Sequence, residues 1–91
     1  MNSLSFSEQR ITTIKQRLTE HLTPSQLEVI DDSAQHHGHS GSQNGAGHFT
    51  VIINSPKFID HSLVECHQLV YAALGNMIGP EIHALQIKIL R

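Results

Sequence analysis

The order in which the hydrophobic spacing changes along this chain is the feature that most restricts its fold. Segments 5–22 and 62–78 place apolar residues three and four positions apart, which predicts two amphipathic helices. Segments 26–32, 48–54 and 82–90 alternate apolar and polar residues, which predicts three strands. The expected order is therefore helix, strand, strand, helix, strand.

Residues with known preferences for helix ends mark the limits of the two helices. Each helix opens on a serine followed three positions later by a glutamate, the spacing of a capping box: Ser5 with Glu8, and Ser62 with Glu65. Thr23-Pro24 is expected to end the first helix and Gly79-Pro80 the second. The second helix is expected to bury one apolar stripe, made of Leu63, His67, Val70, Leu74 and Met77.

The lengths of the connections predict how the strands pair. The first two strands are joined by residues 33–47, a loop rich in Gly, Ser and His, and are expected to pair antiparallel. The last two strands flank a helix and are expected to run parallel, as in other βαβ units. The expected fold is α+β, a mixed three-stranded sheet with both helices on one face.

Eight histidines are the strongest signal in the composition. Because the loop between the first two strands and the start of the last strand lie at the same end of the expected sheet, five of the eight converge there: His36, His37, His39, His48 and His83. Imidazole nitrogen suits zinc, copper, iron and nickel, so we expect metal chemistry at this end.

Each histidine also has a simpler explanation. His83 shares strand parity with Leu85, and so could be a hydrogen-bonded residue at the rim of the core. The loop histidines could be part of a polar loop, and His48 could simply cover the end of the sheet. His67 falls on the apolar stripe of the second helix, which favours a packed residue. The histidines near helix ends, His21 and His61, are expected to be solvated.

Other function classes find little support in the sequence. The formal net charge is −2, which argues against a strongly basic nucleic-acid binder. Cys66 is the sole cysteine, expected to be a partly buried, inert thiol, so the chain cannot form an internal disulfide. No zinc-finger or HExxH motif and no catalytic group was identified, so we expect no enzyme activity. With no apolar run of about 18 residues, we expect a soluble cytoplasmic protein.

Several short segments resemble the BolA family in their order and spacing, from about residue 8 to 90. The segments are Asp32-Ser33, His36, Gly38-His39, Gly41, His48-Phe49, Phe58, Leu63-Val64, His67, Val70-Tyr71, Leu74 and Ile82-His83-Ala84-Leu85. The resemblance implies one BolA-like domain over residues 1–91, similar to a class II KH domain, with an ordered core of about 6–90 and a flexible loop of 33–47.

The same resemblance implies a partner and a cofactor. BolA-like proteins are partners of monothiol glutaredoxins, and the pair holds a [2Fe-2S] cluster with thiolates from glutaredoxin and glutathione. The BolA side supplies two ligands, which correspond to His83 and His36, with His37 or His39 as alternatives to His36. No cluster is expected in the isolated chain. Plain zinc or copper buffering by the loop histidines is a further possibility.

The second role that the resemblance implies is transcriptional regulation in stress responses through DNA binding. This sequence departs from the pattern there, because Cys66-His67-Gln68 replaces the Arg-His-Arg that the family often shows. The Gly-x-x-Gly loop of KH domains is also absent. Lost phosphate contacts weaken DNA affinity, and the remaining candidate contacts are Lys57, His67 and Lys88.

Overall fold

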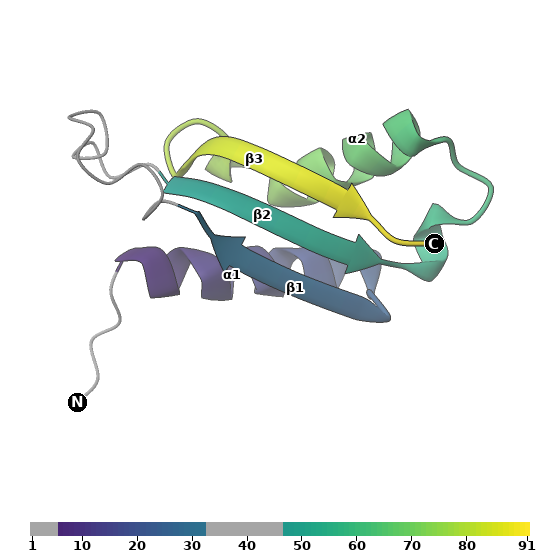
Figure 1. The fold of residues 1–91 in the computed structure, drawn as a ribbon, viewed down its shortest axis with the longest axis horizontal. Helices are drawn as coiled ribbons and strands as arrows, with labels where there is room; N and C mark the ends of the chain where they lie inside the picture. The colour runs from purple at the N-terminus through teal and green to yellow at the C-terminus, as the bar shows by residue number, and fades with distance from the viewer. Residues whose placement is uncertain (1–5, 33–46) are drawn as a thin grey trace.

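The computed structural model describes residues 6–32 and 47–91. Their elements follow the predicted order (Figure 1). The elements are α1 (Phe6–Leu22), β1 (Gln26–Asp31), β2 (Gly47–Asn54), the short 3₁₀ helix η3 (Pro56–Phe58), α2 (Leu63–Leu74), the 3₁₀ helix η4 (Gly75–Met77) and β3 (Ile82–Ile89). Ser5 and the loop of residues 33–46 lie outside the described residues, so the capping box predicted at Ser5 stays a prediction.

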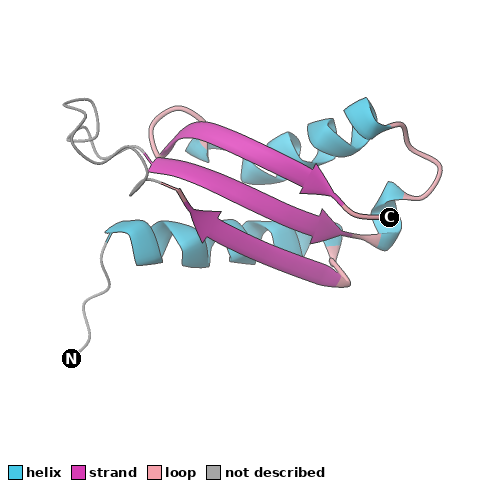
Figure 2. Cartoon of the chain, in the orientation of Figure 1, coloured by secondary structure: helices cyan, strands magenta, loops and turns pink. Residues whose placement is uncertain are grey.

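The three strands form one mixed sheet in the order β1-β2-β3. β1 runs antiparallel to β2, with Val29 opposite Val51, and β2 runs parallel to β3, with Val51 opposite Ile87. Both helices cover the same face of this sheet, and no helix of the described residues lies on the other face (Figure 2). The predicted α+β class, strand pairing and layering are confirmed.

The core lies between the sheet and the two helices. Every second residue of β2 is buried on the helix side, namely Phe49, Val51 and Ile53. The alternate residues of β2, including His48 and Thr50, are half-buried and lie on the face without helices, called here the open face. The helices complete the core with Ile14, Leu18, Leu22, Cys66, Val70, Ala73 and Leu74.

The helix α1 follows its sequence pattern closely. Ile14, Leu18 and Leu22 are buried at steps of four residues. The helix ends at Leu22, and the next residue, Thr23, takes a positive φ of 41° before Pro24, a residue that disfavours continuation of the helix. The predicted end of this helix is confirmed.

The helix α2 differs from its prediction in length and orientation. It ends at Leu74 rather than near residue 78, because Gly75 takes a φ of 55° and Arg17 Nη1 donates to the Leu74 carbonyl at 2.7 Å. The predicted apolar stripe is partly wrong, since Leu63 is 52% exposed whereas Cys66 is fully buried. The face buried by α2 carries Cys66, Val70, Ala73 and Leu74.

Candidate metal centre at the bulged end of the sheet

An irregularity in the pairing of β2 with β3 sets the position of His83. Gly47 lies opposite Ile82, but His48 lies opposite Ala84, so His83 is an extra residue without a partner in β2. Ile82 is 2% exposed on the helix side, and His83 is exposed. The alternative interpretation of His83 as a residue at the core rim is therefore wrong, because this bulge breaks the alternation that runs back from Leu85.

The bulge brings His83 to the imidazole of His48. The two ring centroids are 5.3 Å apart and the ring planes are tilted by 45°. The expected convergence of histidines is thus observed for His48 and His83, across 35 positions of sequence. His48 also does more than cover the end of the sheet, since its ring contacts His83. The other predicted members, His36, His37 and His39, lie outside the described residues.

Backbone hydrogen bonds hold the His48 segment from both sides. Asp32 N donates to the His48 carbonyl at 2.7 Å, and Gly47 N donates to the Glu81 carbonyl at 3.0 Å. On the far side of the bulge, Gly79 N donates to the Ile82 carbonyl at 2.9 Å. These hydrogen bonds hold the backbone of His48 and of the residues on either side of the bulge.

A shallow cavity of about 500 Å³ lies beside His48, over the first residues of β2 and β3. One side of it is acidic, where Asp32 accepts a short hydrogen bond from Thr50 Oγ1. The cavity is lined by Asp32, His48, Phe49, Thr50, Ala84, Leu85 and Gln86. His48 therefore borders this cavity, and His83, which is not part of the lining, is itself exposed at the surface.

The described histidines at this end of the sheet offer nitrogen donors, and no thiol lies near them. The single thiol of the chain, Cys66, is fully buried in the core, with its Sγ 3.9 Å from the Phe58 carbonyl oxygen and 3.8 Å from Arg91 Nη1. Among residues 6–32 and 47–91, no three His, Cys, Asp or Glu side chains form a group able to hold a metal ion. The described residues therefore offer two imidazoles, and any further ligand must come from elsewhere.

The remaining histidines lie away from this pair. His21 is exposed in the last turn of α1, as expected. His61 is exposed and its Nδ1 lies 3.3 Å from Glu65 Oε1 at the start of α2. His67 is half-buried on α2, beside the buried face rather than on it. None of these three residues belongs to the sheet that carries His48 and His83.

The candidate nucleic-acid contacts are distributed over different parts of the fold. Lys57 is exposed on η3, and His67 lies on α2 in the helix layer. Lys88 pairs with Ile52 and is exposed on the open face, on the other side of the sheet from α2. These three residues therefore do not form one continuous basic face.

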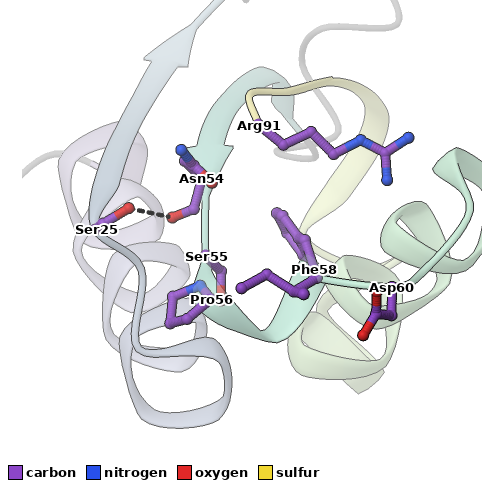
Figure 3. A pocket seen from close by; sticks show the side chains of 8 residues that line it. Ser25, Asn54, Ser55, Pro56, Phe58, Asp60 and Arg91 are labelled. Atoms are coloured by element: carbon purple, nitrogen blue, oxygen red, sulfur yellow. Dashed lines mark hydrogen bonds between the residues drawn. The ribbon is translucent and has the colours of Figure 1, made fainter.

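Sequence reasoning missed a second cavity, at the opposite end of the sheet (Figure 3). It has a volume of about 430 Å³ and is lined by Ser25, Asn54, Ser55, Pro56, Phe58, Ile59, Asp60 and Arg91. Ser55 is 2% exposed and donates to the Leu22 carbonyl at 2.5 Å, while its Oγ accepts from Lys57 N. The sequence signal for this turn was the Ser-Pro pair, because a serine cap followed by proline opens a short helix.

Comparisons with known proteins agree on one family. A sequence model described as BolA-like protein matches residues 18–91. A BolA-like protein of Dictyostelium discoideum is 45% identical over 75 residues, which cover 81% of this chain and 63% of that protein. The SufE-like protein 1, chloroplastic/mitochondrial, of Arabidopsis thaliana is 39% identical over 79 residues, covering 81% of this chain and 21% of that protein. This chain therefore spans less than two thirds of both relatives.

A bacterial relative and a solved structure extend the comparison. The DNA-binding transcriptional regulator BolA of Escherichia coli is 30% identical over 74 residues, covering 81% of this chain and 68% of that protein. The solved BolA domain of SufE1 from Arabidopsis thaliana superposes with a TM-score of 0.76 at 37% identity, covering 96% of this chain and 93% of that domain. The described helices include none long and apolar enough to cross a membrane.

Proposed function

The chain belongs to the BolA-like family, and from that premise we propose that it is a non-enzymatic adaptor that binds a monothiol glutaredoxin. In this proposal the pair co-ligates a [2Fe-2S] cluster, with thiolates from glutaredoxin and glutathione and imidazoles from this chain. The observation that supports it most is the bulge at His83, which exposes that imidazole at the end of the sheet where the 33–46 loop is attached.

The donor chemistry of the chain fits a shared cluster better than a cluster held by this chain alone. The thiol of Cys66 is buried in the core and not available to a surface ligand set, so in this proposal the chain supplies imidazole and the partner supplies the thiolates. In the proposal His83 is one ligand and His36 the other, with His37 or His39 as its replacement. Imidazole ligands on one iron raise the reduction potential of a [2Fe-2S] centre relative to thiolates alone.

Visible circular dichroism of a mixture with cluster-loaded glutaredoxin tests this proposal. The cluster spectrum of a glutathione-loaded monothiol glutaredoxin should change when the chain is added, and His83→Ala should abolish that change. His21→Ala is the matched control, because His21 is also an exposed imidazole and lies in the helix layer. An unchanged spectrum with the unmodified chain, or a full change with His83→Ala, would refute the proposal.

The choice among loop ligands follows from the same assay. Single alanine substitutions at His36, His37 and His39 should show which of them is the ligand, with His36→Ala expected to have the largest effect on the cluster spectrum.

We also propose the cytoplasm as the compartment, which cell fractionation tests directly. Detection of the protein in an organelle would correct this part, a relevant outcome because one relative is named chloroplastic/mitochondrial.

A second candidate function is DNA binding with a regulatory role, favoured by the name of the Escherichia coli relative. The wide separation of Lys57, His67 and Lys88 and the net charge of −2 predict weak binding with a shallow salt dependence. Fluorescence anisotropy with duplex DNA at about 50 mM salt and above would test it. Saturable binding that Lys57→Ala and Lys88→Ala both weaken would favour this function, and no saturable binding would exclude it.

A further inference from the structure

The open face of the sheet, turned toward the viewer in Figure 2, is acidic on β1 and basic on β3. Glu28 on β1 lies opposite Ile52 on β2, and Ile52 lies opposite Lys88 on β3. Both charged side chains are exposed, and neither forms an ion pair with another described residue. Asp32, just beyond β1, adds a second carboxylate on the acidic side, where it accepts the hydrogen bond from Thr50 Oγ1. The two signs of charge therefore lie on opposite sides of β2.

Within one chain these charges are held apart by the central strand. Neighbouring strands lie about 4.8 Å apart, so the backbones that carry Glu28 and Lys88 are separated by roughly 10 Å. Ile52 stands between them and is half-buried. A hollow of about 300 Å³ adjoins this row and is lined by Gln26, Leu27, Glu28, Ile52 and Leu90. A cationic side chain from another molecule can therefore reach Glu28 while its aliphatic part lies against Ile52.

We propose that the open face binds the open face of a second copy of this chain, in a dimer whose two-fold axis runs parallel to β2. A half-turn about that axis places β1 of each copy over β3 of the other, and β2 over β2. Glu28 of each copy then faces Lys88 of the other, and the two Ile52 side chains meet at the centre. Because both copies use the same surface, one row of the sheet provides two ion pairs.

The charges favour this orientation over the other two-fold arrangement of stacked sheets. With the axis at right angles to the strands, β1 would lie over β1 and β3 over β3. Glu28 would then approach Glu28 of the second copy, and Lys88 would approach Lys88, which is unfavourable in both pairs. Sheets that stack face to face keep their strands within about 30° of each other, and both arrangements satisfy that condition. Electrostatics therefore decides between them.

The size of the face predicts a weak and transient dimer. Three strands at about 4.8 Å spacing, with up to eight residues at about 3.3 Å each, give a footprint of roughly 14 by 26 Å, or about 370 Å² on each copy. Both footprints together are smaller than the about 1,200 Å² at which stable complexes begin. Apolar contact comes from side chains such as Ile52 and Ile30, of which Ile30 is 37% exposed. We therefore expect a dissociation constant of roughly 0.1–1 mM, which should rise with salt.

Sedimentation velocity of the full 91-residue chain at low salt, over a series of concentrations, measures this association. The average sedimentation coefficient should rise with concentration. Glu28→Lys or Lys88→Glu alone should weaken association by about 10-fold or more, which corresponds to about 1.4 kcal/mol, because each change turns two attractions into two repulsions. Glu20→Lys and Lys15→Glu are matched controls, since both residues are exposed on α1 and make the same changes of charge away from the open face.

Exchange of the two charges separates specific pairing from a general effect of net charge. The double variant Glu28→Lys, Lys88→Glu keeps the native net charge and should dimerise as the unmodified chain does. A mixture of the two single variants should associate more strongly than either alone, because each copy then meets charges of opposite sign. A double variant that stays as weak as the single variants, or equal weakening by the α1 controls, would overturn the proposal. A native chain that remains monomeric up to about 1 mM would also overturn it.

The dimer and the glutaredoxin adaptor can fail separately. The sedimentation experiment contains no glutaredoxin and no cluster, so its failure leaves the adaptor function standing. In the circular dichroism assay, Glu28→Lys should retain the spectral change that His83→Ala abolishes. If the native chain is monomeric and Glu28→Lys loses that change, the open face binds glutaredoxin instead and the dimer is refuted. An adaptor that fails its own assay would leave the dimer intact.

Discussion

The bulge at His83 can be tested by stability measurements alone, and the proposed role of His83 as a cluster ligand depends on it. In the structure Ile82 is 2% exposed and His83 is exposed. Without the bulge, His83 would lie on the same side of the strand as Leu85. His83 would then be buried and Ile82 would be exposed. Substitution of each residue by alanine therefore distinguishes the two registers.

The expected cost of Ile82→Ala follows from its burial. The change removes three carbon atoms, and at about 0.8 kcal/mol per buried methylene it costs about 2.4 kcal/mol. The unfilled space adds to this, so we expect a loss of about 2.5–4 kcal/mol in the free energy of unfolding. His83→Ala should change it by less than about 0.5 kcal/mol, as other exposed substitutions do.

Urea unfolding followed by far-UV circular dichroism measures both variants. With the m-value unchanged, the shift in midpoint reports the change in stability. The Tm of Ile82→Ala should fall by at least about 10 °C, given about 4–8 °C per kcal/mol for a domain of this size. Ile87→Ala is a matched control on the same strand, and its smaller cost should reflect partial burial. A costly His83→Ala with a harmless Ile82→Ala would refute the bulge and with it the exposed position of His83.

Three further predictions concern the helix layer. Ser62→Ala should cost about 1 kcal/mol in urea unfolding, because Ser62 Oγ accepts from Glu65 N at 3.1 Å. The hydrogen bonds from Ser62 N and from His61 lower the pKa of Glu65. The native chain should therefore be more stable than Glu65→Gln at neutral pH, where Glu65 is ionised. This difference in the free energy of unfolding should disappear as the pH falls through the lowered pKa. An advantage that persists in strong acid would contradict this cause. Because Cys66 is fully buried, its thiol should resist alkylation in the folded protein. It should react only to the extent that urea unfolds the chain. Rapid labelling of the native state would contradict this prediction.

The parts of the fold that depend on local chemistry were predictable from the sequence. The capping box at Ser62 and Glu65 is present as expected, because both hydrogen bonds involve residues three positions apart. The alternation of β2 is reproduced in its burial, because a strand has only two faces. The prediction of the buried face of α2 was less accurate. Its sequence is apolar on several sides, so periodicity alone did not distinguish Leu63, which is exposed, from Cys66, which is buried.

The candidate site shows the same division between local and tertiary information. Topology alone predicted that His48 and His83 would approach each other, since parallel strands begin at the same end of a sheet. Their ring contact at 5.3 Å depends on the bulge between Gly47 and His48 in the register of β2 and β3. No residue type in the sequence marks that bulge. Either Ile82 or His83 could be the buried residue, and the alternation from Leu85 to Ile89 would be the same in both cases.

The sequence by itself determined the order of the elements, the pairing of the strands and the end of the sheet at which the histidines gather. These features follow from hydrophobic period, capping residues and connection length, all of which act over a few residues. Only the tertiary structure decided that Ile82 enters the core and that His83 stands outside it beside His48. That choice is made by packing against the helices, where burial of an isoleucine side chain stabilises the fold, whereas burial of an imidazole costs free energy unless its hydrogen bonds are kept.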